Sequence, residues 1–102
     1  MAEPDGSGPA GQARPVEATV VLRNQAGLHA RSGAALVKTA ARFDARVTLQ
    51  LKAQSANARS LMDLLRLGAR QGDGIQITAT GPDATAAVEA IAALMEHGFG
   101  EE

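Results

Sequence analysis

The sequence contains no cysteine, no tryptophan and no tyrosine. Without cysteine, the chain forms no disulfide scaffold, thiolate metal site or cysteine nucleophile. Two phenylalanines are its only aromatic residues, whereas proteins that bind single-stranded nucleic acid usually stack the bases on several aromatic side chains. These absences exclude thiol chemistry and disfavour a nucleic-acid-binding function.

The sequence also lacks an excess of charge of either sign. Ten Lys and Arg residues stand against eleven Asp and Glu residues, which gives a formal net charge of -1. Such a chain presents no broad basic field to nucleic acid or to a membrane surface. It has no apolar run near the roughly 20 residues of a membrane span and no signal-peptide pattern. We therefore expect a cytoplasmic monomer with no membrane insertion and no nucleic-acid partner.

Domain organisation follows from the length and from the first segment of the chain. A sequence of 102 residues holds one ordinary core but not two. Residues 1–15 contain three of the four prolines and three of the eleven glycines, with no large aliphatic side chain after Met1. They bury too little apolar surface to offset the entropy lost on ordering. We predict a disordered N-terminal tail over residues 1–15 and one folded domain over residues 16–102.

The hydrophobic pattern predicts the order of the secondary structure. Alternating apolar residues indicate strands over residues 16–23, 46–51 and 75–80, and a weak, polar strand is expected over residues 54–57. Helical spacing indicates helices over residues 30–42, 61–67 and 84–97. In the first helix the repeating apolar positions are Ala30, Ala34, Val37 and Ala41, flanked by Leu36 and Ala40. Ser60, with Asp63 in a capping box, and Asp83 are the expected N-caps of the other two helices.

Strands that alternate in this way are buried on one face only, so all the helices should cover the same face of the sheet. The order β-α-β-β-α-β-α then predicts an α+β fold. It is an open-faced β-sandwich, with a four-stranded, mainly antiparallel sheet and three helices on one face. The first two strands are joined through a helix and should run parallel, with the fourth strand antiparallel between them.

The segment Gly27-Leu28-His29-Ala30-Arg31 suggests a chemical site. His29 falls at the start of the first predicted helix, where unpaired N–H groups and the positive end of the helix dipole attract anions. The dipole disfavours the imidazolium cation, which leaves a free ring nitrogen as a nucleophile. Arg31 adds a guanidinium suited to phosphoryl oxygens. In the alternative interpretation, His29 only caps the helix and Arg31 is a solvated charge.

GLHAR at a helix start, followed in order by VKTAARFDARVTL, NARSLMDLL and GDGIQITATGPD, resembles the HPr phosphocarrier family of the bacterial phosphoenolpyruvate-dependent phosphotransferase system. The resemblance runs from Val16 to Gly98 and implies the fold predicted above. It implies that enzyme I phosphorylates His29 on Nδ1 and that the group passes to a histidine of a IIA-type acceptor. By the same resemblance, Arg31 steadies the phosphoryl group. We expect no metal and no organic cofactor.

The chain departs from the family pattern directly after this site. Where the family usually has proline, this sequence has Ser32, followed by Gly33. Replacing proline restores a backbone donor near the phosphoryl site. The backbone of Ala30 and Ser32 and the Ser32 hydroxyl are therefore expected to bind phosphate, while Gly33 loosens the turn. A non-proline residue here and the closing residues 96–102 are similar to the regulatory, nitrogen-related (NPr-like) branch of the family.

Ser60 has two interpretations. As an N-cap, its hydroxyl satisfies a helix amide. The segment Arg59-Ser60-Leu61-Met62 is also similar to the regulatory serine site of the family, which HPr kinase/phosphorylase phosphorylates in organisms that have that enzyme. A phosphate adds a charge of about -2, so its expected effect is repulsion at a docking face without unfolding.

The second helix has more apolar residues than two turns bury on one side. Leu61, Met62 and Leu65 resemble the docking surface that family members present to enzyme I and to acceptors. We expect Met62 and Leu65 to be exposed in one patch with His29, while both burial and exposure stay open for Leu61. The main alternative function is a non-transferring regulatory module that binds a protein partner through this surface under the control of Ser60. A small-ligand regulatory domain of ferredoxin-like build is a third interpretation, which gives no reason for the GLHAR spacing.

Overall fold

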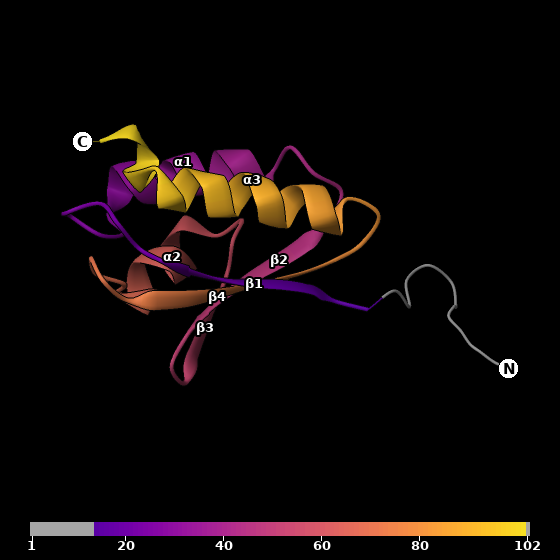
Figure 1. The fold of residues 1–102 in the computed structure, drawn as a ribbon, viewed down its shortest axis with the longest axis horizontal. Coiled ribbons are helices and arrows are strands. Elements are labelled where there is room, and N and C mark those ends of the chain that lie inside the picture. Colours follow the sequence, from indigo (N-terminus) through magenta and orange to yellow (C-terminus); the bar gives the residue numbers. More distant parts are fainter. Residues whose placement is uncertain (1–13, 102) are drawn as a thin grey trace, which may run out of the picture.

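The computed structural model describes residues 14–101 (Figure 1). Most of the predicted tail, residues 1–13, lies outside the described residues, as does residue 102. The elements follow one another in the predicted order. They are β1 (Val16–Val21), α1 (Ala30–Ala40), β2 (Arg46–Leu51), β3 (Gln54–Asn57), α2 (Leu61–Leu67), β4 (Gly74–Thr80), α3 (Ala84–Glu96) and a short 3-10 turn, η2 (Gly98–Gly100).

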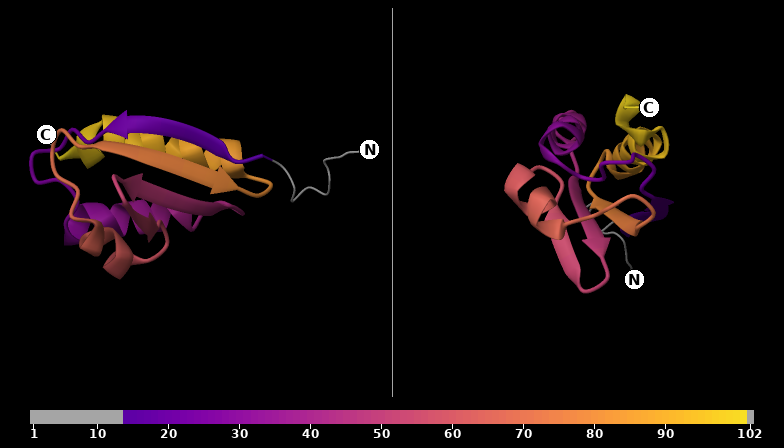
Figure 2. Two further views of the ribbon diagram at one scale, coloured as in Figure 1. Left: turned by 90° about the horizontal axis from the view of Figure 1, so that it is seen from below. Right: turned by 90° about the vertical axis from the view of Figure 1, so that its left-hand side faces the viewer.

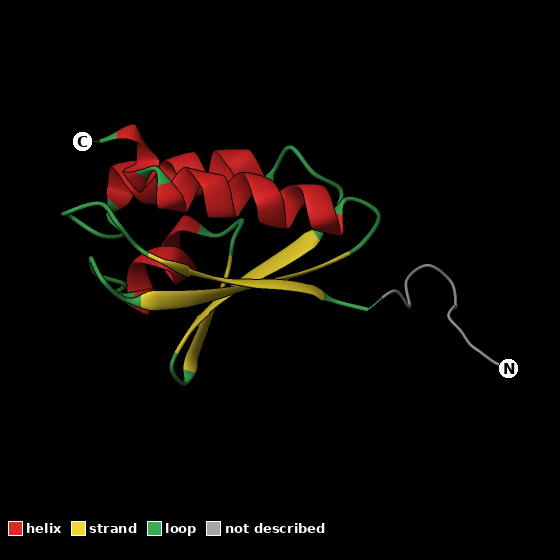
Figure 3. Cartoon of the chain, viewed as in Figure 1, coloured by secondary structure: helices red, strands yellow, loops and turns green. Residues whose placement is uncertain are grey.

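The four strands form one sheet in the order β1-β4-β2-β3, and every neighbouring pair is antiparallel. Strand β4 lies between β1 and β2, so β1 and β2 run in the same direction, as predicted. All the helices lie on one face of the sheet, and the other face is uncovered (Figures 2 and 3). The open-faced α+β sandwich predicted from the alternating strands is confirmed.

The core lies between the sheet and the helices. Strands β1 and β4 pair Val20 with Ile75, and β2 and β4 pair Leu49 with Ile77, all four of them buried. The positions between them carry polar residues on the open face, which accounts for the alternation in the sequence. The largest fully buried hydrophobic side chains come from both layers: Leu22, Leu36, Leu49, Leu64, Ile75, Ile77, Ile91, Met95 and Val47.

Helix α1 differs from its prediction in length and in its buried face. It ends at Ala40 instead of Arg42, and its buried residues are Ser32, Gly33, Leu36 and Ala40. The residues of the predicted stripe are exposed or half-buried: Ala30, Ala34, Val37 and Ala41. The prediction was wrong because the Leu36 side chain removes far more apolar area from water than an alanine does. Its burial sets the orientation of the helix.

The N-caps of the other helices are confirmed in one case and corrected in the other. The Ser60 hydroxyl accepts a hydrogen bond from the Asp63 N–H at 3.2 Å, as an N-cap should. The Asp63 carboxylate accepts from the Asn57 N–H instead of closing a capping box. Asp83 precedes α3 without a side-chain cap bond, because its carboxylate accepts the Asp44 N–H at 2.7 Å. A contact between two loops has taken the place of the cap.

Within residues 14–101, no helix has the length and apolar character needed to cross a membrane. The same part of the chain has no group of three or more His, Asp or Glu side chains arranged to hold a metal ion. The widely spaced Asp63, Asp73 and Asp83 accordingly form no cluster there.

Candidate functional site

The turn before α1 places His29 at the start of the helix. Gly27 has a φ of 69°, and Leu28 donates its N–H to the Ala69 carbonyl at 3.0 Å. A Cβ on Gly27 would lie 2.5 Å from that carbonyl oxygen, so only glycine allows the turn to pack this closely. With Leu28 buried beneath it, His29 adopts an extended backbone conformation and is the N-cap of α1. The imidazole reaches the surface, with 36% of its side chain exposed.

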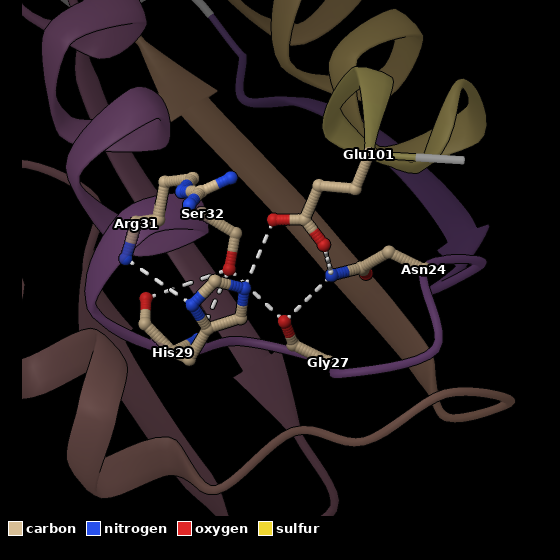
Figure 4. Close-up of polar contacts among 6 residues, drawn as sticks. All are labelled: Asn24, Gly27, His29, Arg31, Ser32 and Glu101. Carbon is tan, nitrogen blue, oxygen red and sulfur yellow. Dashed lines mark hydrogen bonds and ion pairs between the residues drawn. The ribbon is translucent and has the colours of Figure 1, made fainter.

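The two ring nitrogens of His29 have different partners (Figure 4). Nδ1 accepts a hydrogen bond from the Arg31 N–H at 3.2 Å, and Nε2 lies 2.9 Å from Oε2 of Glu101. A carboxylate only accepts hydrogen bonds, and a backbone N–H only donates them. The neutral ring therefore carries its proton on Nε2 and its lone pair on Nδ1. The lone pair lies beside the first N–H groups of α1, where an anion is favoured.

Ser32 forms a capping box with His29. Its hydroxyl accepts the His29 N–H at 3.0 Å and donates to the Gly27 carbonyl at 3.0 Å. Only 1% of the residue is exposed. The hydroxyl has a single proton, which it donates to the Gly27 carbonyl in this structure, so that proton is not free for a phosphoryl oxygen here. Its role is to hold the turn and the helix start together, a role that proline could not fill.

Replacing Ser32 with alanine should destabilise the protein by about 1–2 kcal/mol. The substitution removes both hydrogen bonds and leaves the buried Gly27 carbonyl with one donor fewer. Urea unfolding followed by circular dichroism measures the change in the free energy of unfolding. Ser55→Ala is the control, because Ser55 is exposed on β3. Equal stability of the two variants would contradict the structural role of the Ser32 hydroxyl.

The site also contains two residues, Asn24 and Glu101, whose role the sequence did not reveal. Asn24 is fully buried, and its amide donates to the Gly27 carbonyl at 2.7 Å and to Oε1 of Glu101 at 2.9 Å. Glu101 therefore touches Asn24 with one carboxylate oxygen and His29 with the other (Figure 4). The hydrogen bond from Asn24 is the main cause that lowers the pKa of Glu101 below 4.5, and His29 and Arg31 add to it.

The end of the chain reaches the site through a left-handed turn. Gly98, Phe99 and Gly100 all have positive φ angles, of 61°, 59° and 71°. Glycine adopts such angles without strain, and the half-buried Phe99 packs against the core. This turn directs residue 101 back over the start of α1. No local pattern signals it, because Glu101 lies 72 residues from His29 in the sequence.

Arg31 reaches the site that the sequence assigned to it. It is exposed, and within residues 14–101 its guanidinium forms no ion pair. Figure 4 shows its side chain beside the imidazole and the Glu101 carboxylate. Its charge is close enough to contribute to the lowered pKa of Glu101. A permanent cation therefore lies near the His29 ring and the Glu101 carboxylate, where it is available to an incoming anion.

Helix α2 begins next to the first turn of α1. A Cβ on Gly33 would lie 2.7 Å from Cδ1 of Leu61, so the glycine allows the two helices to pack closely. Leu61 is half-buried, which decides between the burial and the exposure that the sequence left open. Met62 is 64% exposed and Leu65 is 38% exposed, which confirms that these two apolar side chains face solvent. The close packing of α1 against Leu61 therefore accounts for a glycine at position 33, which helix propensity alone did not explain.

The comparisons with known proteins agree on one family. A protein-family model described as "PTS HPr component phosphorylation site" matches residues 16–97. Phosphocarrier protein HPr of Xylella fastidiosa is 37% identical over 87 residues, which cover 85% of this chain and 98% of that protein. Multiphosphoryl transfer protein of Vibrio cholerae is 41% identical over 92 residues, which cover 87% of this chain but 23% of that protein.

A solved structure has the same fold. HPr-C-His from Thermoanaerobacter tengcongensis matches with a TM-score of 0.82 and 37% sequence identity, over 85% of this chain and 98% of that chain. The family model, the full-length relative and this structure cover the same domain, and they confirm the resemblance seen in the sequence. The chain belongs to the HPr family of phosphocarriers of the phosphotransferase system.

Proposed function

We propose that this phosphocarrier receives its phosphoryl group on Nδ1 of His29 from the phosphohistidine of enzyme I. It then passes the group to a histidine of a IIA-type acceptor. The observation that carries the proposal is the lone pair on Nδ1, which lies at the N-terminus of α1 while Nε2 faces a carboxylate. A neutral, partly exposed imidazole with its free nitrogen at an anion-favouring helix end is a suitable acceptor.

The transfer exchanges one phosphoramidate bond for another. The Nδ1 lone pair of His29 attacks the phosphorus atom, the phosphorus–nitrogen bond of the donor breaks, and its electron pair returns to the donor ring. Because both bonds are of the same type, the rate depends on positioning and charge neutralisation more than on a large driving force.

The first turn of α1 supplies groups that would neutralise the phosphoryl oxygens. The Arg31 N–H now donates to Nδ1 at 3.2 Å. When Nδ1 bonds to phosphorus, this donor becomes available to a phosphoryl oxygen. Ala30 is the first residue of α1, so its N–H has no acceptor within the helix. With the positive charge of Arg31, these donors would neutralise the phosphoryl oxygens. Ser32 contributes by holding the turn.

Partner proteins would dock beside this turn on helix α2. Leu61 contacts the start of α1, and Met62 and Leu65 are the exposed apolar side chains of the same helix. Small apolar patches among polar residues mark transient interfaces, which suits a carrier that must bind a donor and release it. A non-transferring regulatory module would use the same surface. It would not require the lone pair on Nδ1.

The test is to mix the protein with enzyme I and radiolabelled phosphoenolpyruvate. We expect a label that is stable in alkali and lost in acid, as a phosphohistidine is. Phosphorus–nitrogen correlation in the nuclear magnetic resonance (NMR) spectrum should place it on Nδ1. No label, while another HPr is labelled in parallel, would contradict the proposal. Binding of enzyme I without transfer would instead support the regulatory module.

Replacing Ser60 with aspartate should slow phosphorylation of His29 about tenfold, because a negative charge at the docking surface repels an acidic partner face and costs about 1.4 kcal/mol. The measurement is kcat/KM for transfer from enzyme I. Ser60→Asn is the matched control, because asparagine caps a helix as well as aspartate does but carries no charge. Equal rates for the two variants would remove the basis for proposing that HPr kinase/phosphorylase regulates this protein through Ser60.

A further inference from the structure

The Glu101 carboxylate bridges two side chains of the turn that carries His29. Its Oε1 accepts from the Asn24 amide at 2.9 Å, and its Oε2 lies 2.9 Å from Nε2 of His29 (Figure 4). Only 15% of the Glu101 side chain is exposed. The carboxylate is therefore held at a defined position on the side of the ring opposite the Nδ1 lone pair.

This arrangement selects one of the two neutral forms of the imidazole. With the proton on Nε2, the ring donates to Glu101 and accepts from the Arg31 N–H. With the proton on Nδ1, both contacts fail, because an N–H would face an N–H and a lone pair would face a carboxylate. The partner of one ring nitrogen thus decides the protonation of the other.

Asn24 fixes the carboxylate in turn. Its amide nitrogen has two acceptors, Glu101 and the Gly27 carbonyl, so the amide can point only one way. The Asn24 oxygen is buried and has no hydrogen-bond partner within residues 14–101. A buried unpaired acceptor is destabilising. Turning the amide over would bring its oxygen against two other acceptors, which is worse. The orientation of Asn24 is therefore imposed by what it holds.

We propose that Glu101 is a positioning residue for phosphoryl transfer, which holds the proton of His29 on Nε2 and stabilises the ring as Nδ1 forms its bond to phosphorus. The inference rests on the proposed function of His29. As Nδ1 donates its electron pair, the ring becomes more positive, and the facing carboxylate stabilises that charge. The Nε2 proton stays on its nitrogen throughout, and Glu101 forms no covalent bond. In serine hydrolases, the aspartate of the catalytic triad likewise fixes the protonated nitrogen of the catalytic histidine and stabilises its positive charge.

The charges around the carboxylate support this role. Asn24 donates to it from the turn after β1, His29 contacts it from the start of α1, and the Arg31 cation lies nearby. Together these groups lower its pKa below 4.5. This lowered pKa keeps Glu101 ionised near neutral pH, so the negative charge is present when the ring accepts the phosphoryl group.

The decisive measurement pairs a transfer rate with the position of the ring proton. In wild-type protein, nitrogen-15 NMR spectra of the neutral His29 ring should show the proton on Nε2. In Glu101→Ala, we expect both neutral forms and a kcat for phosphorylation by enzyme I that is about tenfold to a hundredfold lower, the loss expected for one charge-assisted hydrogen bond. Glu101→Gln keeps an oxygen that accepts from Nε2, and should restore the ring proton but only part of the rate.

The control variant is Glu96→Gln, because Glu96 is an exposed carboxylate in the last turn of α3. It should leave both readouts unchanged. If wild-type protein accepts no phosphoryl group, the proposed function of His29 fails. If wild-type protein is labelled and Glu101→Ala keeps its rate or its single ring form, only the role of Glu101 fails. Amide spectra of each variant verify that the fold is retained.

Discussion

Replacing His29 with alanine is expected to abolish phosphorylation of the chain by enzyme I and phosphoenolpyruvate. The substitution removes the nitrogen that bonds to phosphorus, and the Arg31 guanidinium and the helix N–H groups only stabilise charge. Losing a nucleophile lowers a transfer rate by at least about 1000-fold, so no label above background should accumulate while wild-type protein is fully labelled. His29→Asn should give the same result with the N-cap retained, because asparagine is a good capping residue.

The second histidine of the sequence provides the internal control. The chain contains two histidines, and His97 is the exposed C-cap of α3. The negative end of a helix dipole repels anions, so this imidazole is poorly placed to accept a phosphoryl group. His97→Ala should therefore be labelled like the wild-type protein. Label that survives in His29→Ala and disappears in His97→Ala would reassign the phosphorylation site.

Replacing Gly27 with alanine should give the largest loss of stability among the variants described. The new Cβ would lie 2.5 Å from the Ala69 carbonyl oxygen and 2.9 Å from Cα of Arg70, both of them backbone atoms that cannot turn aside. The residue must also keep a φ of 69°. Overlap and conformational strain together should cost about 3 kcal/mol or more. The melting temperature should fall by more than about 10 °C.

A second glycine separates the two causes of this loss. Gly72 has a φ of 93°, and nothing lies within 4 Å of the Cβ it would gain. Gly72→Ala should therefore show the conformational cost alone, about 1–2 kcal/mol. Urea unfolding of both variants gives the difference that is due to crowding. If Gly27→Ala is no less stable than Gly72→Ala, the close packing of the His29 turn on the segment after α2 is not important for stability.

Gly27→Ala also tests how the turn before α1 supports the phosphorylation site. The Gly27 carbonyl accepts from both the Ser32 hydroxyl and the Asn24 amide, and these two side chains hold the helix start and Glu101. A displaced Gly27 would therefore disturb the position of His29 from both sides. Stability and phosphoryl acceptance should decline together in Gly27→Ala, in contrast to Glu101→Ala, which is expected to lose rate with little loss of fold.

The arrangement of the sheet followed from the sequence because its rules are local or topological. Alternating residues such as Val47 and Leu49 face one layer, and a strand–helix–strand connection orients β1 and β2 in parallel. Those rules left β4 as the strand between them, as observed. The buried face of α1 did not follow, because alanines lie on several sides of that helix and only packing shows that Leu36 points inward.

The functional site divides in the same way. His29, Arg31 and the start of α1 could be predicted, because a helix N-terminus is formed by residues within one turn of each other. The use of the Ser32 hydroxyl depended on the path of the Gly27 turn, which local propensity does not determine. The sequence assigned no function to Asn24, and Glu101 was named only within the closing residues 96–102.

The sequence by itself therefore determined the order of the elements, the sheet that they form and the histidine at the start of α1. Only the tertiary structure determined which ring nitrogen of His29 carries the proton. That choice depends on a carboxylate 72 residues away, delivered by a left-handed turn at Gly98–Gly100 that packs against the core. Periodicity and caps act over a few residues, whereas a hydrogen bond between distant segments exists only after the core has brought them together.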